Sequence, residues 1–346
     1  MNYINKIKKY LLFFYCSILS LKPYFNNFLE LRKHTNIKDH ELIMGVYDYE
    51  SYEGPWSIGD FICYLFFFKC FVKYKKKIEV LIIVDFKKLN KFKRNILRIQ
   101  VACSKIFLSK FLHKVCVISW KDFKKLNLNK YYIPYKEDIL KRKDIRQNFV
   151  SMYNKMLINC NQKQLNDFLI NKHDFDKYKP KKNFPKKYIT WHIRKNSKWS
   201  QFRNIKKTEF IELYNILREK VNTLPIIIIS DQTGCNFAKS ISKKNNLDLL
   251  FCKDISKSIF SDFYLMAKGK LFFTFKPAGM MCVPWFAKFN FIWGGGFGLK
   301  DQISSGRSVS VDKLHFWWTK KQIWNNSNSF NDFKRRVNNI NFSKFK

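Results

Sequence analysis

The run Pro225-Ile-Ile-Ile-Ile-Ser-Asp231 decides the fold, because four consecutive isoleucines lie between a proline and two polar residues. A second apolar run, Ile78–Val84, is also unbroken and rich in β-branched residues. Such runs are typical of parallel strands that are buried on both faces. A helical pattern, Cys235–Lys244, follows the isoleucines directly. A strand followed at once by a helix is the repeating unit of parallel α/β sheets.

The same alternation continues on both sides of this run. In the C-terminal half we expect strands at Tyr188–Ile193, Ile226–Ile229, Asp248–Phe251, Leu271–Phe275 and Phe291–Trp293. One helix of this half begins at Thr208 as its N-cap, and three others span Cys235–Lys244, Ser258–Lys268 and Ala278–Lys288. In the N-terminal half we expect strands at Leu42–Tyr47, Ile78–Val84 and Val115–Ser119, and helices at Phe61–Tyr74, Phe92–Leu112 and Ile139–Asn159. The pattern predicts an α/β fold with two Rossmann-like, doubly wound parallel-sheet domains.

A lysine-rich stretch with two prolines, Lys177–Lys187, separates the two series and is interpreted as the inter-domain linker. The expected organisation is a helical, basic segment over residues 1–40, a first domain over 41–180, a second domain over 181–300 and a tail over 301–346 that packs back on the body. In the first segment, three lysines precede the apolar run Leu11–Leu21, which is too short to span a bilayer. Either a membrane-surface helix or an ordinary packed helix fits this pattern.

Charge is the unusual property of the composition. The 346 residues carry 66 basic and 26 acidic side chains, a net charge of +40, while apolar residues make up 46%. Such a charge favours acidic partners, namely anionic lipid, nucleotide-linked substrates or nucleic acid. Compositional drift towards lysine is an equal alternative, because the lysines are scattered along the chain.

Cysteine and histidine spacing argues against a protein metal site or a disulfide framework. The nine cysteines are odd in number, and most lie inside apolar runs. They are interpreted as reduced thiols of a cytosolic protein, with peripheral attachment to the inner face of the membrane as a further expectation.

Polar residues follow the predicted strands of the second domain, at the edge where open parallel sheets bind ligands. Arg194 follows the first strand, Ser230 and Asp231 the second, Asp254 the third, and Lys276-Pro277-Ala278-Gly279 the fourth. An arginine, carboxylates and a helix N-terminus together suit a nucleotide diphosphate. Each of these residues also has an ordinary structural explanation when taken alone. Arg194 fits a surface residue, Asp231 fits a helix cap, and Lys276 is one of many lysines in the chain.

This order of residues resembles the three peptide motifs of the fucosyltransferase superfamily, over Tyr188–Trp293. The residues concerned are His192-Ile193-Arg194, Ile229-Ser230-Asp231, and Asp254 followed by Thr274-Phe275. The resemblance implies a B-type glycosyltransferase fold, GT-B-like, with two domains facing a cleft. It further implies that Arg194 and the turn Lys276–Gly279 bind the donor phosphates and that Asp254 lies near the base or ribose. The chain departs from the family at Lys195, Asn196, Lys276 and Pro277, so a GDP-sugar is only slightly favoured as co-substrate.

In the first domain, Ser57-Ile58-Gly59-Asp60 resembles the loop of bacterial heptosyltransferases, which share that fold. The resemblance implies that Asp60 is the general base, with Gly59 allowing close approach to the donor. An N-cap role for Asp60 is equally compatible. Glu53 is the second acidic candidate of this loop, Trp56 and Tyr52 are candidates for stacking on an acceptor sugar, and Arg203-Asn204 is a candidate donor clamp.

The sequence therefore predicts a metal-independent, inverting glycosyltransferase without a resident cofactor. Its donor is a nucleotide diphosphate sugar and its acceptor a polysaccharide or glycolipid. The alternatives are a nucleic-acid-binding protein, against which the scattered lysines argue, and a non-catalytic member of the same fold.

Overall fold

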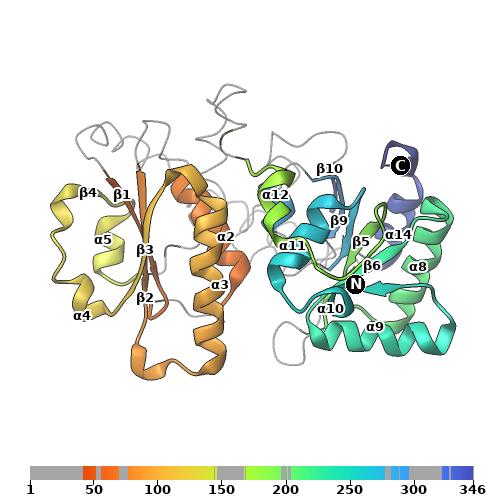
Figure 1. Cartoon of the computed structure of the whole chain (residues 1–346), viewed down its shortest axis with the longest axis horizontal. Helices are drawn as coiled ribbons and strands as arrows, with labels where there is room; N and C mark the ends of the chain where they lie inside the picture. Colours follow the sequence, from red (N-terminus) through yellow and green to blue (C-terminus); the bar gives the residue numbers. More distant parts are fainter. Residues whose placement is uncertain are drawn as a thin grey trace, which may run out of the picture. The chain divides into compact units, whose positions relative to one another are not determined.

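The computed structural model describes residues 42–51, 56–69, 77–143, 145, 167, 169–195, 201, 204–276, 282–287, 289–295, 322–326 and 329–345. These residues fall into two compact units, one ending at Asp167 and the other beginning at Leu169. Each unit contains a parallel β-sheet with helices, so the chain is an α/β protein (Figure 1).

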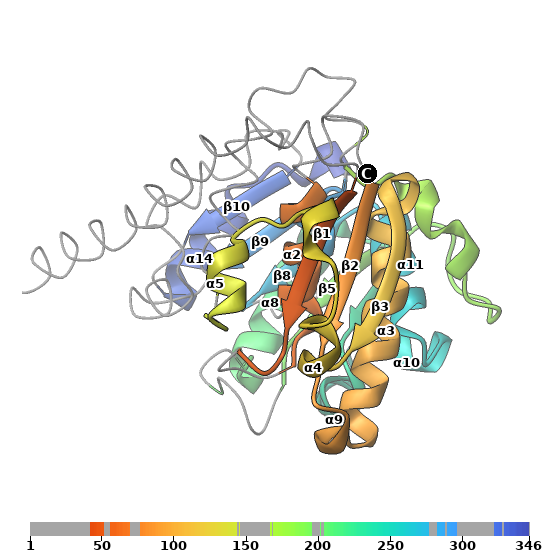
Figure 2. The same cartoon turned by 90° about the vertical axis from the view of Figure 1, so that its left-hand side faces the viewer.

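The first unit is built on a four-stranded sheet of order β3-β2-β1-β4, and all neighbouring strands are parallel. The strands are β1 Leu42–Asp48, β2 Lys77–Ile83, β3 Leu112–Ile118 and β4 Tyr131–Tyr132. The helices are α2 Ile58–Lys69, α3 Lys91–Phe107, α4 Trp120–Phe123 and α5 Lys136–Leu140, with 3-10 turns η3 Phe86–Lys88, η4 Ser109–Phe111 and η5 Leu128–Lys130. Figure 2 shows β1, β2 and β3 running side by side.

Helix α2 forms the core of this unit, because it is apolar on all sides and only its first turn reaches solvent. Ten of its residues, Gly59 and Phe61–Lys69, are buried. Gly45 of β1 makes the close packing of α2 possible, since a Cβ at this position would lie 2.6 Å from the ring of Phe68. A helix that is hydrophobic all round requires this burial.

The second unit contains a six-stranded sheet of order β10-β9-β8-β5-β6-β7, again with every pair parallel. The strands are β5 Ile189–His192, β6 Ile226–Ile229, β7 Leu250–Phe251, β8 Phe272–Phe275, β9 Phe291–Gly295 and β10 Gln322–Asn326. The helices are α8 Lys207–Val221, α9 Gln232–Asn245, α10 Cys252–Ile255, α11 Ile259–Lys268, α12 Cys282–Trp285 and α14 Phe330–Asn338, with η7 Lys172–Tyr178 and η11 Phe342–Phe345. Figure 1 shows α11 and α12 on one side of this sheet and α8 and α14 on the other.

Apolar strands and aromatic side chains form the core of the second unit. All four isoleucines of β6 are completely buried. Trp191 of β5 stacks on Phe210 of α8 at 4.5 Å, and Phe275 of β8 stacks on Phe333 of α14 at 4.7 Å. The helices of one face are thereby fixed to the central strands.

Several predicted boundaries change in the structure. Residues 169–180 group with the second unit, not the first, because Ile170 pairs with Ala287 and Phe175 packs against Phe263 at 6.1 Å. Helix α3 ends at Phe107, where the prediction carried the helix to Leu112, the first residue of β3. Most of the predicted helix 139–159 and all of residues 1–40 lie outside the described residues, while the predicted helix 278–288 is described over 282–287 and contains α12.

Within the part of the chain that the structure describes, every helix is too short or too polar to cross a lipid bilayer.

Candidate functional site

The carboxyl edge of the second sheet contains a topological switch point between β5 and β8. From β5 the chain builds β6 and β7 on one side, and later β8, β9 and β10 on the other. Ligands of doubly wound proteins bind near the carboxyl ends of the strands at such a switch point.

Two cationic side chains lie at this switch point. Arg194 follows β5, Lys276 follows β8, and each residue is only 9% exposed. Both contact Asn204: Arg194 Nη1 donates to Asn204 Oδ1 at 3.1 Å, and Lys276 Nζ lies 3.4 Å from the Asn204 carbonyl oxygen. The structure thus brings together two predicted donor-binding residues whose positions in the sequence are far apart.

Glu209 is the acidic residue of this cluster and is absent from the sequence-based candidates. Its two carboxylate oxygens lie 2.8 Å and 2.9 Å from Lys276 Nζ, and both side chains are buried. Glu209 also accepts a hydrogen bond from the backbone N–H of Lys206 at 2.8 Å. This bond starts helix α8 after Lys206, so the predicted N-cap role of Thr208 is wrong.

Lys276 has a left-handed backbone, with φ of 55°. For a residue with a long side chain this conformation costs on the order of 1 kcal/mol. The strain and the buried ion pair together fix the position of the ammonium group.

His192, the last residue of β5, is neutral. Its Nδ1 lies 3.3 Å from Thr274 Oγ1 of β8. Burial, together with the charge of Arg194, lowers the pKa of His192 to about 3. The imidazole therefore acts as an uncharged hydrogen-bonding group that joins the two central strands.

The end of β6 is closely packed against the end of β5. Ser230 Oγ donates to the Ile193 carbonyl oxygen at 2.9 Å. Asp231 accepts from the Gly234 backbone N–H at 2.8 Å and is the N-cap of α9, which is the alternative role considered from sequence. A Cβ on Gly234 would lie 1.9 Å from Ser230 Oγ, so the first turn of α9 approaches the strand as closely as only glycine allows.

Asp254 lies further along the same edge, after β7. It is exposed, and its carboxylate pairs with Lys239 at 2.5 Å. Three interstrand steps separate β8 from β7, a distance of about 14 Å at the usual spacing of parallel strands. Lys276, Arg194, Ser230 and Asp254 therefore follow four neighbouring strands of the sheet.

Five sequence candidates, Glu53, Arg203, Pro277, Ala278 and Gly279, lie outside the described residues.

In the first unit, Asp60 is an exposed residue of the first turn of α2, and Gly59 beside it is buried. The helix begins at Ile58, and the hydroxyl of Ser57 accepts from the Asp60 backbone N–H at 3.2 Å. Ser57 therefore caps the helix, and the alternative N-cap role for Asp60 is wrong. Among the described residues, none pairs with the Asp60 carboxylate.

Aromatic residues order the described part of the loop before α2. Trp56 stacks on Tyr49 at 3.7 Å, and Lys93 Nζ lies 5.1 Å from the centre of the Trp56 ring. Gln100 Nε2 donates to the Ser57 carbonyl oxygen at 3.1 Å. An acceptor sugar would have to share the Trp56 ring with Tyr49 and Lys93, while Tyr52 lies outside the described residues.

Asp48, at the carboxyl end of β1, is a further polar residue that sequence reasoning did not select. Its buried carboxylate accepts from Arg142 Nε at 3.1 Å and from Arg142 Nη2 at 3.2 Å. The signal in the sequence was an aspartate directly after a buried strand. Its partner Arg142 lies 94 residues away, and nothing in the sequence indicated that the two residues would pair.

Among the described residues no group of three or more histidine, cysteine or acidic side chains has the geometry of a metal site. No family model, curated protein or solved structure matches this chain.

Proposed function

We propose that this protein is a metal-independent, inverting glycosyltransferase of the B-type fold, which binds a nucleotide diphosphate sugar at the carboxyl edge of the second sheet. The observation that carries the proposal is the convergence of Arg194 and Lys276 on Asn204 at the switch point of a six-stranded parallel sheet. Two separate α/β units with parallel sheets in one chain also support it.

In this proposal Arg194 and Lys276 bind the diphosphate, and Asp254 binds the ribose or base. Arginine presents two parallel N–H donors to a phosphate. Lys276 is held by Glu209, so it offers its charge from a fixed position and shares it between the carboxylate and the phosphate. Fixed positive charge stabilises the leaving nucleotide better than mobile side chains do.

The chemical step is a direct displacement at the anomeric carbon. The acceptor hydroxyl oxygen forms the new C–O bond, while the bond to the β-phosphate oxygen breaks and the nucleoside diphosphate leaves with that electron pair. Asp60 takes the proton of the attacking hydroxyl. The acceptor is a hydroxyl of a polysaccharide or glycolipid.

The first test measures nucleotide binding through the rise in thermal unfolding temperature, in the presence of EDTA. We expect one of the diphosphates GDP, UDP, ADP and dTDP, screened beside the monophosphate CMP, to add about 2.7 kcal/mol of stability at about 100 times its dissociation constant. Arg194→Ala should weaken binding of that diphosphate by about 10- to 100-fold, the value of a charged hydrogen bond, and should leave the nucleoside almost unaffected. Arg194→Lys should restore only part of the affinity, because it lacks the paired donors.

Lys243→Ala is the matched control, since it removes an exposed positive charge from the end of α9. Equal losses for nucleoside and diphosphate in Arg194→Ala, or binding that requires added magnesium or manganese, would contradict the proposal.

A further inference from the structure

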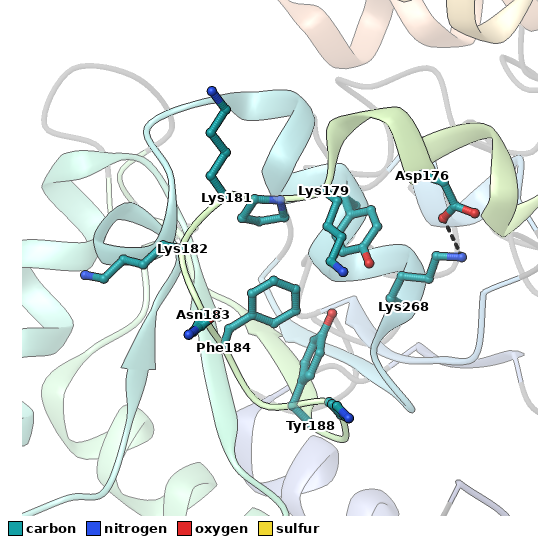
Figure 3. A pocket seen from close by; sticks show the side chains of 11 residues that line it. Asp176, Lys179, Lys181, Lys182, Asn183, Phe184, Tyr188 and Lys268 are labelled. Carbon is teal, nitrogen blue, oxygen red and sulfur yellow. Dashed lines mark ion pairs between the residues drawn. The ribbon is translucent and has the colours of Figure 1, made fainter.

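A cavity with a volume of about 840 Å³ lies beside helix α11 in the second unit. It is formed by the segment that leads into β5 and by the end of α11, which precedes β8. Figure 3 shows it from close by. The lining residues are Asp176, Lys179, Pro180, Lys181, Lys182, Asn183, Phe184, Lys186, Tyr188, Tyr264 and Lys268.

The charge of this lining is strongly positive. Five of the lining residues are lysines, and one, Asp176, is acidic. Asp176 is already paired, with Lys268 at 2.6 Å and with the His173 ring at 3.1 Å. Among the described residues no acidic group pairs with Lys179, Lys181 or Lys186. The cavity therefore has an excess of positive charge that no neighbouring carboxylate neutralises.

The floor of the cavity is aromatic and uncharged. Phe184 contacts Tyr188 edge-on at 5.9 Å and Tyr264 at 6.2 Å. Tyr188 donates its hydroxyl to the Leu265 carbonyl oxygen at 3.1 Å, and burial raises its pKa, so the phenol stays protonated. Apolar walls of low dielectric strengthen the attraction between the lysines and an anion.

The lysine-bearing segment is attached firmly to the body of the unit. Tyr178 stacks on Phe260 at 5.0 Å, and Ser261 Oγ donates to the Tyr178 carbonyl oxygen at 3.1 Å. Lys182 Nζ donates to the Asp254 carbonyl oxygen at 2.8 Å, and Pro180 is buried. In Figure 3 the Lys179 side chain is directed towards the Tyr188 hydroxyl, whereas Lys181 and Lys182 extend away. The backbone that carries these lysines therefore needs little further ordering when an anion binds.

We propose that this cavity is a second anion site, which binds a ligand with a phosphomonoester or pyrophosphate group. Its volume is in the range of small-molecule sites, and lysine binds phosphate as a point charge. The ligand chemistry is shared by soluble phosphoesters and by phospholipid headgroups. The site is separate from the switch point and stands whether or not the protein is a glycosyltransferase.

The test is protection of individual lysines from acetylation, read by mass spectrometry on the intact protein. Inorganic pyrophosphate should protect Lys179 and Lys186 at least several-fold more than Lys243 and Lys244, which are exposed at the end of α9. The protection should persist in the Arg194→Ala variant, because pyrophosphate bound at the switch point would depend on Arg194, whereas pyrophosphate bound in this cavity would not. Equal protection of all four lysines would show general charge attraction only and would overturn the proposal.

A binding measurement with paired variants completes the test. The double variant Lys179→Gln/Lys186→Gln should weaken pyrophosphate binding at this site about tenfold, as expected for two exposed ion pairs. The matched variant Lys243→Gln/Lys244→Gln, with the same change in charge, should change it less than about twofold. Similar losses in both pairs, or no loss in either, would overturn the proposal. Unfolding temperatures of both variants check that the fold is intact.

Two further ligands distinguish the sources of the phosphate. Protection of Lys179 and Lys186 by glycerol 3-phosphate identifies a soluble phosphoester ligand. Protection only by vesicles of phosphatidylcholine with phosphatidic acid, and not by phosphatidylcholine alone, identifies a headgroup. Absence of protection by pyrophosphate, glycerol 3-phosphate and both vesicles alike contradicts the site.

Discussion

Asp60 differs from the other acidic residues near the carboxyl edge of the first sheet, because no described residue pairs with its carboxylate and Ser57 caps the helix in its place. We predict that Asp60→Asn lowers turnover by about 100- to 10,000-fold, the usual contribution of a general base, while nucleotide affinity stays within a few-fold. Release of nucleoside diphosphate from the donor, with a panel of saccharide acceptors, measures this. Glu53→Gln should lose less, and the reverse ranking would assign the base to Glu53.

His192 makes a separate prediction about pH. Because its pKa is about 3 in the folded protein and about 6.5 when unfolded, protonation favours the unfolded chain. The stabilisation that neutral His192 contributes is fully present above about pH 6.5. It is lost as the pH falls towards 3, by about 1.4 kcal/mol for each pH unit. His192→Gln should remove this slope.

Urea unfolding of both proteins between pH 4 and 7 measures the difference. Asp262 changes the free energy of unfolding in the opposite direction with pH. Burial raises its pKa to about 6, so its stabilising contribution is lost as the pH rises. Both proteins contain Asp262, so its effect cancels in the comparison. Parallel pH profiles for the two proteins would contradict a neutral, buried His192.

At the scale of elements, Glu209 connects the start of α8 with the loop after β8. Glu209→Gln keeps an oxygen for the Lys206 N–H but leaves the buried Lys276 ammonium without its counter-charge. Breaking a buried ion pair from one side typically costs about 3–5 kcal/mol. We predict a loss of that size in urea unfolding, and a smaller one for the double variant with Lys276→Met.

The same variant tests whether phosphate reaches Lys276. If it does, the nucleotide diphosphate should stabilise Glu209→Gln more than the unchanged protein, since the phosphate replaces the lost carboxylate. Equal stabilisation of the two proteins would place the phosphate away from Lys276.

Elements that are buried on both faces could be predicted closely from sequence. The four isoleucines of β6 are where the pattern placed them, and α11 begins one residue after the predicted start at Ser258, because local composition alone decides such elements. Strands β4 and β10 and helix α14 were not predicted. Two-residue β4 is too short for a pattern, and β10 and α14 lie in an aromatic and basic tail whose polarity does not alternate clearly.

The candidate site was predictable only in part, for the same reason. Arg194 and Lys276 follow strands, and strand ends can be located from sequence. Glu209 has no such signal, because its partner Lys276 lies 67 residues away and its position on α8 resembles any polar helical residue. Likewise, the Ser57 cap was missed because Asp60, three residues later, fits the same rule.

At the scale of the whole molecule, the net charge of +40 predicts reversible attachment to anionic membranes. The full chain should float with vesicles that contain anionic phospholipid and should be released as salt rises, since the Debye length falls from about 30 Å at 0.01 M to about 3 Å at 1 M. Binding to neutral vesicles that is unchanged by salt would contradict attachment by charge. It would favour insertion of the apolar run Leu11–Leu21, which lies outside the described residues.

The parallel pairing of β5 with β8 has a consequence for synthesis on the ribosome. β5 is the central strand of its sheet, yet the residue that His192 meets on β8 comes 82 positions later. Until β8 emerges, one edge of β5, including the largely apolar stretch Tyr188–Ile193, lacks its neighbour. Distant parallel pairings form slowly, and unpaired apolar strands promote aggregation. We therefore expect the second unit to depend more on chaperones during synthesis than the first, whose described strands have all been made once Tyr132 is added.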